Sequence, residues 1–320
     1  MTTFDETATS EQVIEAFAPQ IKGRTFVITG AGKPSIGSQI ATSLARGSPA
    51  HILITSRTAK KVEPVLKDIT EIDSSIKTTF VQVDLTDHDS VRQTAKDILA
   101  AAPKIDVLIN SAGNMAIKDY TVDKQGIEIQ LSANYVGHFL LTNLLVPALS
   151  AAGGARVVNL TSSGYLLSPF RFDDWNFSDG KTYHHWTGYG QAKTANVLFA
   201  YGLTKRLESR GVTSTATHPG YNHETELGSH LTLEDYSEIP AIMKRNTGRD
   251  WEWETPRSKT YTQIAATSLI AALDPAIPAK SPAYLMNSQI HEPAEHARDP
   301  DSADKLWELS ERLVGQMFEY

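Results

Sequence analysis

Cysteine is absent from the 320-residue sequence, which excludes a disulfide framework and any site built on a thiolate. Long apolar runs are also absent. The longest, 139–149, is interrupted by Thr142 and Asn143 and falls short of the roughly 18 residues of a membrane span. The first residues, MTTFDETATSEQ, are acidic and lack the basic and apolar pattern of a signal peptide. These absences predict a cytoplasmic protein with no membrane span.

Basic blocks are missing as well, and the net charge is −7, so nucleic acid is not an expected partner. The ten histidines show no spacing typical of metal ligands, and the sequence therefore predicts no metal site. The hydrophobic content of 41% and the charged content of 21% are ordinary for a globular chain that buries a sizeable core.

Short apolar segments alternate with segments of helical pattern along the chain. Runs such as HILIT and IDVLIN are apolar on both faces, which is typical of parallel strands buried between helices. This order predicts one α/β domain over residues 1–320, a doubly wound and mainly parallel seven-stranded sheet with helices on both faces. Strands are expected at 24–28, 51–55, 78–83, 105–109, 155–160, 213–217 and 283–286, and helices at 10–17, 37–46, 59–70, 88–101, 127–150, 188–209, 258–273 and 302–316.

The segment 29–37 reads TGAGKPSIG and lies between an expected strand and an expected helix. Strand, glycine-rich turn and helix form the context of a dinucleotide-binding loop. The glycines allow a tight turn and let the backbone approach a pyrophosphate, and the helix N-terminus offers free N–H groups to that anion. The alternative is an ordinary strand-to-helix loop with several glycines.

Tyr189 and Lys193 are four positions apart in a segment of helical pattern, so their side chains share one helix face. A lysine beside a tyrosine favours the phenolate and is expected to lower the pKa of the phenol. Tyr189 could then exchange a proton near neutral pH. The alternative is a chance pair on a solvated face, and the glycine-rich loop at the expected distance upstream argues against it.

Seven motifs in fixed order make the chain resemble the short-chain dehydrogenase/reductase family over about 21–318. The motifs are TGAGKPSIG at 29–37, VDL at 83–85, NSAG at 110–113, Asn134 in SANYVGHF, NLTSS at 159–163, YGQAK at 189–193 and HPG at 218–220. The stretches NYVGHFLLTNLL and KLWELSERLVG further resemble its retinol-dehydrogenase-like branch. The resemblance implies a Rossmann-type fold and an NAD(P)-dependent oxidoreductase.

Two departures from the family pattern are visible. The glycine loop is one residue longer than the usual TGxxxGxG, and Ser35 stands in place of the second glycine. Because serine can still offer its N–H or hydroxyl to a phosphate, we expect altered loop geometry rather than lost binding. The stretch after HPG is also one residue longer than usual before Thr225.

The resemblance implies a catalytic set of Asn134, Ser162, Tyr189 and Lys193. Tyr189 would donate a proton to a carbonyl during reduction and accept one during alcohol oxidation. Lys193 would lower the Tyr189 pKa and bind the nicotinamide ribose, and Ser162 would hold the substrate oxygen, with Ser163 as the competing candidate. Asn134 would hold a water in a proton relay to Lys193.

The end of the second expected strand, LITSRT, predicts the cofactor. It carries Ser56 and Arg57 where an NAD site places an acid, and an arginine suits the 2′-phosphate of NADPH. Lys33 would add positive charge on the same side, and the alternative is that both cations are simply solvated. The full set of expected cofactor contacts is Gly30, Gly32, Lys33, Ser35, Ile36, Gly37, Ser56, Arg57, Asp84, Leu85, Asn110, Ala112, Gly113, Tyr189, Lys193, Pro219, Gly220 and Thr225. Of these, Asn110 could equally be a structural tie between neighbouring strands.

Two insertions interrupt the alternation. The first, 165–186, holds seven aromatic residues, which are interpreted either as a wall of the substrate site or as anchors of a long loop. The second, 221–256, is long for a connection in a compact domain, and we expect a substrate lid that is mobile without ligand and closes over the nicotinamide.

The sequence therefore favours an NADPH-dependent carbonyl reductase or dehydrogenase that acts on a small-molecule carbonyl or alcohol of apolar or aromatic character. A non-catalytic NADPH-binding sensor or scaffold is the alternative function. A homodimer is a candidate assembly, and the substrate itself does not follow from the sequence.

Overall fold

An eight-stranded sheet forms the centre of the molecule, and the computed structural model describes residues 4–320 around it. The strand order is β3-β2-β1-β4-β5-β6-β7-β8, and β1 to β7 are parallel. The strands are β1 (Thr25–Thr29), β2 (His51–Ser56), β3 (Lys77–Gln82), β4 (Val107–Asn110), β5 (Ala155–Leu160), β6 (Val212–His218), β7 (Ala283–Met286) and β8 (Gln289–His291). The predicted doubly wound parallel sheet is confirmed.

The eighth strand corrects the expectation of seven. β8 pairs antiparallel with β7 through a turn in which Asn287 and Ser288 both have positive φ, 52° and 63°. Such two-residue turns match the twist of a hairpin. The three residues of β8 are too few to show an alternating pattern in the sequence.

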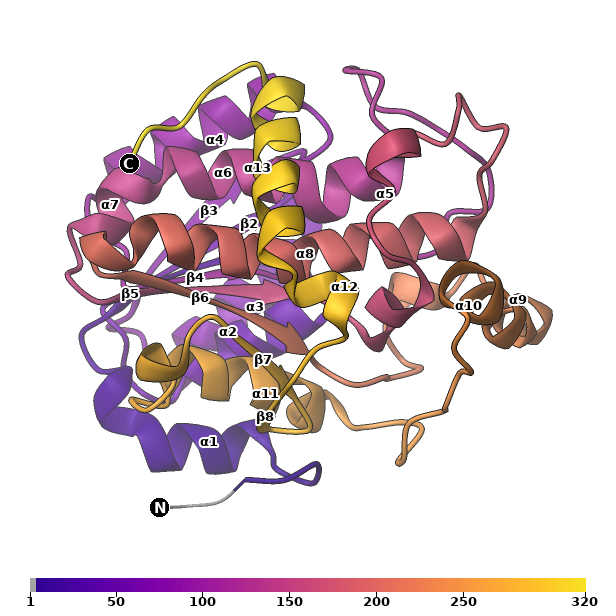
Figure 1. The fold of residues 1–320 in the computed structure, drawn as a ribbon. Helices are drawn as coiled ribbons and strands as arrows, with labels where there is room; N and C mark the ends of the chain where they lie inside the picture. The colour runs from indigo at the N-terminus through magenta and orange to yellow at the C-terminus, as the bar shows by residue number, and fades with distance from the viewer. Residues whose placement is uncertain (1–3) are drawn as a thin grey trace.

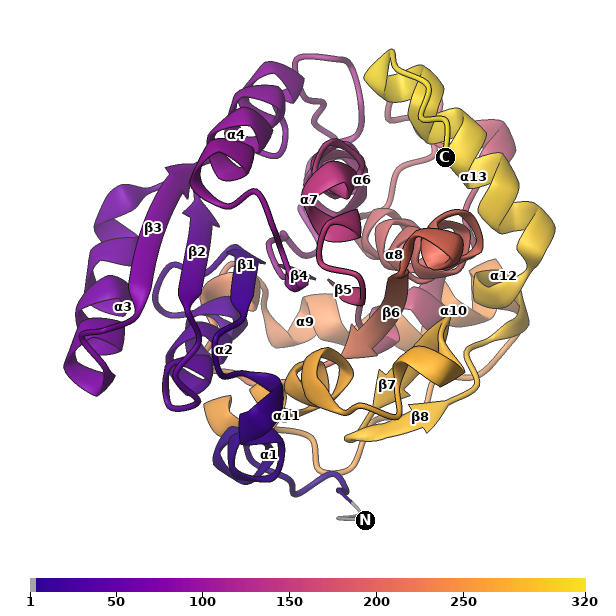
Figure 2. The same ribbon diagram turned by 90° about the vertical axis from the view of Figure 1, so that its left-hand side faces the viewer.

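Helices cover both faces of the sheet (Figures 1 and 2). One layer holds α1 (Ser10–Phe17), α2 (Ile36–Ala45), α3 (Ala59–Ile72) and α11 (Tyr261–Leu273), and the other holds α4 (His88–Ala101), α6 (Gly137–Leu144), α7 (Val146–Ser150), α8 (His185–Leu207) and α13 (Pro300–Val314). Each layer buries its own apolar core against the sheet. Shorter helices are α5 (Ile129–Leu131), α9 (Leu233–Ser237), α10 (Ile239–Thr247) and α12 (Glu295–Arg298), and 3₁₀ turns occur at Ala18–Gln20, Ser163–Leu167, Phe172–Asp174, Glu208–Arg210, Glu226–Gly228 and Pro278–Lys280. Within residues 4–320, no helix has both the length and the apolar composition that crossing a bilayer requires.

The helix expected over 127–150 is interrupted. It consists of α5, a π-helical turn at Ser132–Val136, then α6 and α7, and Pro147 lies in the first turn of α7. A π turn widens the helix by one residue and is frequent at functional sites. Here it contains Asn134.

The order of the strands reverses between β1 and β4, so the connections that leave these two strands run to opposite faces of the sheet. Ligands of doubly wound folds bind outside the carboxyl ends of the strands at such a point. The glycine loop leaves β1 there, and Ser111 to Gly113 follow β4.

The hydroxyl of Thr29 joins the ends of β1 and β4. It accepts from the N–H groups of Ser111 (2.9 Å) and Ala112 (3.0 Å) and lies 2.8 Å from Nε2 of His138. Nδ1 of His138 lies 3.0 Å from the Asn134 carbonyl oxygen, so Nδ1 carries the proton and Thr29 donates to Nε2. Burial lowers the pKa of His138 to about 4, which keeps the ring neutral.

Thr29→Val should therefore destabilise the fold by about 1–3 kcal/mol, because it leaves two N–H groups and a buried imidazole nitrogen without a partner. Thr55 is the matched control: it is opposite Thr29 in the sheet register, equally buried, and its hydroxyl has no hydrogen-bond partner among the described residues. Thr55→Val should be neutral or stabilising. Urea unfolding compares the two, and equal midpoints would contradict the assigned role of Thr29.

Candidate active site

The glycine loop brings β1, β4 and α2 into close contact. Gly30 has φ +68°, and a Cβ there would lie 2.5 Å from Cα of Ala112. A Cβ on Gly37 would lie 2.9 Å from the Gly30 carbonyl oxygen. Only glycine fits either position, so the first turn of α2 starts directly against the loop. This is the arrangement that aims a helix N-terminus at a pyrophosphate.

Ser35 is the N-cap of α2. Its hydroxyl donates to the Gly30 carbonyl (2.9 Å) and accepts from the N–H of Ser38 (3.0 Å), and its own N–H donates to the Ser38 hydroxyl (3.1 Å). The longer loop is thus closed by a capping box. Both polar groups of Ser35 are used inside the loop, so a phosphate contact by Ser35 stays a prediction. Ile36 opens α2 beside it.

The two cations expected at the 2′-phosphate differ in their surroundings. The Arg57 side chain is exposed at the end of β2, and no ion pair within residues 4–320 involves it. Lys33 pairs with Asp68 of α3, which offsets its charge. A Cβ on Gly32 would meet Cβ of Lys61 at 2.9 Å and Oγ of Ser56 at 3.4 Å, so the loop passes over the end of β2 and the start of α3.

Asp84, which follows β3, and Asn110, which ends β4, form hydrogen bonds with other residues of the protein. Asp84 accepts from the N–H (2.9 Å) and hydroxyl (2.7 Å) of Thr86 through one carboxylate oxygen, and the carbonyl oxygen of Leu85 would be 2.2 Å from a Cβ on Gly137. Asn110 donates to Thr142 (3.0 Å) and Asn159 (2.9 Å). These bonds confirm that Asn110 ties β4 to β5 and α6, and its contact with a cofactor stays a prediction.

Asn134 and Lys193 converge at Gly113. A Cβ on Gly113 would lie 2.2 Å from Oδ1 of Asn134 and 3.6 Å from Nζ of Lys193. The Asn134 carboxamide accepts from the Asn114 N–H (3.0 Å) and donates to the Asn114 side chain (2.9 Å) and the Gln130 carbonyl (2.8 Å). These bonds hold its oxygen beside the lysine.

Ser162 and Tyr189 meet in the same way at Gly164. A Cβ on Gly164 would lie 2.6 Å from Cε1 of Tyr189 and 3.2 Å from Oγ of Ser162. Nζ of Lys193 is 5.6 Å from the centroid of the Tyr189 ring. The four side chains expected to be catalytic therefore form one cluster at the carboxyl ends of β4 and β5. Ser163 instead gives its N–H to His218 at 3.0 Å.

The expectation of a lowered Tyr189 pKa is wrong for this structure. Burial raises the pKa of Tyr189 to about 12, against a smaller lowering by the hydrogen bond with Ser162. Burial also lowers the pKa of Lys193 to about 8. Desolvation disfavours the charged form of both groups, and it outweighs the attraction that their spacing suggests. The phenol is therefore fully protonated at neutral pH, as a proton donor must be.

The HPG segment ends in contact with Lys259, a residue that the sequence analysis did not single out. Gly220 has φ +91°, and a Cβ there would lie 2.8 Å from Cδ of Lys259. Lys259 is buried and donates to Asn287 at 2.6 Å. Thr225 donates its hydroxyl to the carbonyl of Asn222 at 3.1 Å, while Pro219 directly precedes Gly220 after β6. The contacts of Pro219, Gly220 and Thr225 with a cofactor stay predictions.

Aromatic residues of the first insertion are largely anchors. Tyr165, Phe170 and Phe177 are buried, and Tyr183 donates to the carbonyl of Ile117 at 2.6 Å. Their rings pack into the body, so the anchoring alternative is confirmed for these members. The wall interpretation applies best to Trp186, whose ring contacts Tyr189 edge-on at 6.2 Å between centroids.

The second insertion contains two helices, α9 and α10, which the sequence analysis did not expect. Ile239, Ile242 and Met243 pack with Trp186 and Tyr189 in one apolar cluster, and the indole N–H of Trp186 donates to the carbonyl of Asp235 at 2.7 Å. The segment therefore lies on the site as packed helices rather than as a bare loop. Its mobility and closure stay predictions.

His218 and Glu254 join this lid segment to the serine loop, a contact that sequence reasoning missed although His218 begins the HPG motif. Nδ1 of His218 accepts the N–H of Ser163, and Nε2 donates to Glu254, 2.8 Å from Oε1. Burial by itself would raise the pKa of Glu254, but His218 and Ser163 lower it to about 2. The two residues are 36 positions apart, which leaves no local pattern to find.

Glu254→Gln should speed hydrogen exchange across 250–256, because the His218 N–H then meets a neutral amide and the charge-assisted bond is lost. Glu252→Gln is the control, since Glu252 is exposed and two residues away. Because the folded pKa of Glu254 is depressed below its ordinary 4.5, the contact should be complete above that pH and be lost as the pH falls toward 2. Equal exchange in both variants would exclude this contact as the attachment of the lid.

Comparison with known proteins agrees with this geometry. A sequence model described as short chain dehydrogenase matches residues 24–172. Retinol dehydrogenase 13 from Homo sapiens is 35% identical over 295 residues, 92% of this chain and 86% of that protein. A protein named Probable oxidoreductase from Streptomyces antibioticus is 33% identical over 90% of this chain and 96% of its own length. Among solved structures, 7α-hydroxysteroid dehydrogenase complexed with NADH and 7-oxo glycochenodeoxycholic acid shares the fold, with a TM-score of 0.66 at 19% identity over 87% of this chain and 98% of that one.

Proposed function

The chain belongs to the short-chain dehydrogenase family, in its retinol-dehydrogenase-like branch, and from that premise we propose that it is an NADPH-dependent carbonyl reductase. It would interconvert a ketone or aldehyde and the corresponding alcohol. The observation that carries the proposal is the cluster of Asn134, Ser162, Tyr189 and Lys193 around Gly113 and Gly164. A protein that only senses or stores the cofactor has no chemical need for all four.

The cluster suits proton transfer to a substrate oxygen. Tyr189, protonated at neutral pH, donates its phenolic proton to the carbonyl oxygen, while the Ser162 hydroxyl holds that oxygen beside the phenol. Lys193, with a pKa of about 8, supplies positive charge next to the forming phenolate. Asn134 keeps its carboxamide oxygen near Nζ of Lys193 and can hold a water that returns the proton. A bound nicotinamide supplies the hydride.

The residues around the glycine loop fit such a cofactor. Gly30, Gly32 and Gly37 let the loop pack closely against Ala112, Lys61 and its own backbone, where a Cβ would not fit, and α2 begins directly after this loop. Arg57 follows the end of β2 with an exposed side chain, and its guanidinium would bind a 2′-phosphate by two parallel hydrogen bonds. The preference for NADPH rests on this residue. Because cells generally hold that pool reduced, reduction is the proposed direction.

An apolar or aromatic substrate suits the surroundings of the phenol. Tyr189 belongs to an apolar cluster with Met115, Leu167, Trp186 and Ile239. Such a surface favours flat or apolar carbonyl compounds over sugars or acids, because burying a polar substrate there would leave its groups without partners. Pure protein with NADPH, screened against aromatic ketones, retinal, steroids and polyketide-type ketones by nicotinamide absorbance, tests the class.

Tyr189→Phe should reduce turnover by about 10²–10⁴-fold, the usual contribution of general acid catalysis. NADPH binding and the unfolding midpoint should change little, because the ring remains. Tyr201→Phe in the same helix is the control and should retain full activity. Parent-like turnover of Tyr189→Phe on the best substrate of the screen would show that another group is the acid.

Arg57→Asp should weaken NADPH binding by a few kcal/mol and spare or improve NADH, because a carboxylate repels a 2′-phosphate but accepts from a 2′-hydroxyl. Lys96→Asp makes the same charge change on an exposed site of α4 and controls for net charge. Paired titrations with both cofactors measure the preference. A ratio unchanged by Arg57→Asp would exclude this residue as the reader of the phosphate.

A further inference from the structure

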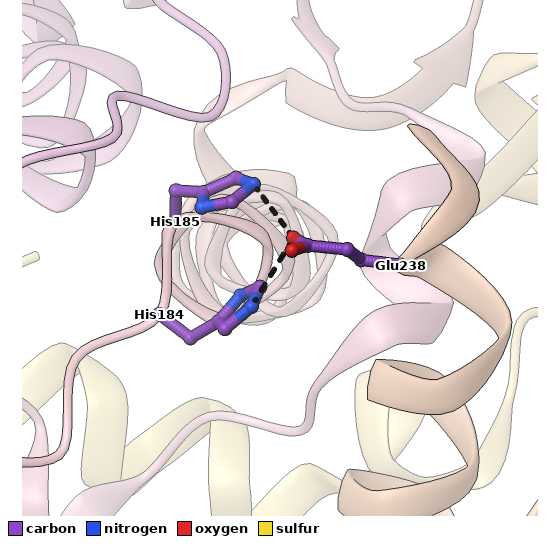
Figure 3. A group of neighbouring side chains, drawn as sticks. All are labelled: His184, His185 and Glu238. Carbon is purple, nitrogen blue, oxygen red and sulfur yellow. Dashed lines mark ion pairs between the residues drawn. The ribbon is translucent and has the colours of Figure 1, made fainter. Parts of the chain in front are cut away.

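Two histidines and a glutamate converge where the lid meets the start of α8. Nε2 of His184 and Nε2 of His185 lie 3.5 Å and 3.4 Å from Oε2 of Glu238, and the three ligand atoms lie within 4.8 Å of one another. Both rings aim their nitrogens at the same carboxylate, which extends from the junction of α9 and α10 (Figure 3). Within residues 4–320 this is the one group of three such side chains close enough to share an ion.

From this convergence we propose that His184, His185 and Glu238 form a zinc site that clamps the lid helices to α8. Two imidazoles, one carboxylate and an open fourth position make up a known zinc ligand set. The fourth position would face solvent, since Glu238 is 44% exposed. The histidine spacing did not predict the site because the third ligand comes from a segment more than fifty residues downstream.

The two distances from the histidine nitrogens to Glu238 exceed those of ordinary hydrogen bonds and are close to the separation of neighbouring ligands of one ion. An N–H···O bond normally spans 2.7–3.2 Å, and both contacts with Glu238 are longer. Zinc–nitrogen bonds of about 2.0–2.1 Å in a tetrahedron separate neighbouring ligand atoms by about 3.3 Å, close to the observed 3.4 Å and 3.5 Å. Nε2 of His185 is buried and has no hydrogen-bond partner among the described residues, a group that an ion would satisfy.

The chemistry of the cluster also suits a cation. Zinc binds neutral imidazole nitrogens and carboxylate oxygens, and the cluster offers two imidazoles and one carboxylate. Lys118 lies nearby, but it pairs with Asp235 at 2.8 Å, which offsets its charge. Arg245 is turned toward Thr187, 3.2 Å from the hydroxyl.

Coordination has one local cost. Nδ1 of His184 accepts the N–H of Trp186 at 3.3 Å as the N-cap of α8. Binding zinc through Nε2 places the ring proton on Nδ1 and removes this long bond. Exchange of the Trp186 amide should therefore become faster on zinc binding, while exchange across α9 and α10 becomes slower. Lid stabilisation alone would not produce this opposite pair of changes.

The test is a titration of the full chain with zinc chloride after dialysis against a chelator. Calorimetry should show one site, and zinc should raise the Tm of the parent. Glu238→Gln and His185→Asn should weaken binding by at least about ten-fold, the scale on which loss of even an outer-shell partner acts. Glu234→Gln, one helical turn before Glu238 in the same lid, and His223→Asn should bind as the parent does.

Zinc affinity and the Tm are measured without enzymatic activity, so the zinc site and the proposed reductase function are tested independently. Absence of zinc binding by the parent would overturn the proposal, and so would binding that survives Glu238→Gln and His185→Asn, since it would lie at other histidines. Glu238→Gln alters a partly exposed side chain and should fold normally, which the unfolding midpoint without zinc checks. If His185→Asn fails to fold, the Glu238→Gln titration alone decides.

Discussion

The carboxamide of Asn134, held against Gly113 beside Lys193, is the contact on which the rest of the site depends. It requires that no Cβ stand at position 113 and that the end of β4 be held to β1, which the Thr29 hydroxyl does. It also requires the π turn, since this turn places Asn134 where its side chain bonds to Asn114 and Gln130. Sheet, loop and helix therefore meet at one amide.

Burial, rather than the spacing of Tyr189 and Lys193 along the helix, determines the direction in which their pKa values shift. Tyr189 and Lys193 are both removed from water, so burial raises the pKa of the phenol and lowers the pKa of the ammonium. Glu254 is also largely removed from water, yet its pKa falls because His218 and Ser163 bind the charged form. The difference lies in the partners, because Glu254 interacts with both His218 and Ser163, whereas the hydrogen bond with Ser162 is too weak to offset the burial of Tyr189.

The lid is attached by polar contacts near its C-terminal end and at the junction of α9 and α10, and by apolar contacts of α10. His218 and Glu254 tie its far end to the serine loop, while Ile239, Ile242 and Met243 pack against Trp186 and Tyr189. Glu238 faces the histidine pair at the start of α8. Moving the segment away would therefore expose apolar surface beside the phenol and separate both polar contacts.

The sequence by itself determined the parallel sheet, its alternation with helices and the glycine loop, because these depend on the short-range patterns of strand period and glycine position. Helical spacing placed Tyr189 and Lys193 on one helix face, whereas Asn134 and Ser162 followed from the resemblance to the family. Only the tertiary structure decided the antiparallel β8, the π turn at Asn134, the helices of the lid, the capping role of Ser35 and the Glu254 contact. It also reversed the expected shift of the Tyr189 pKa. These features depend on burial and on partners far apart in the chain, and neither is written in any local stretch of residues.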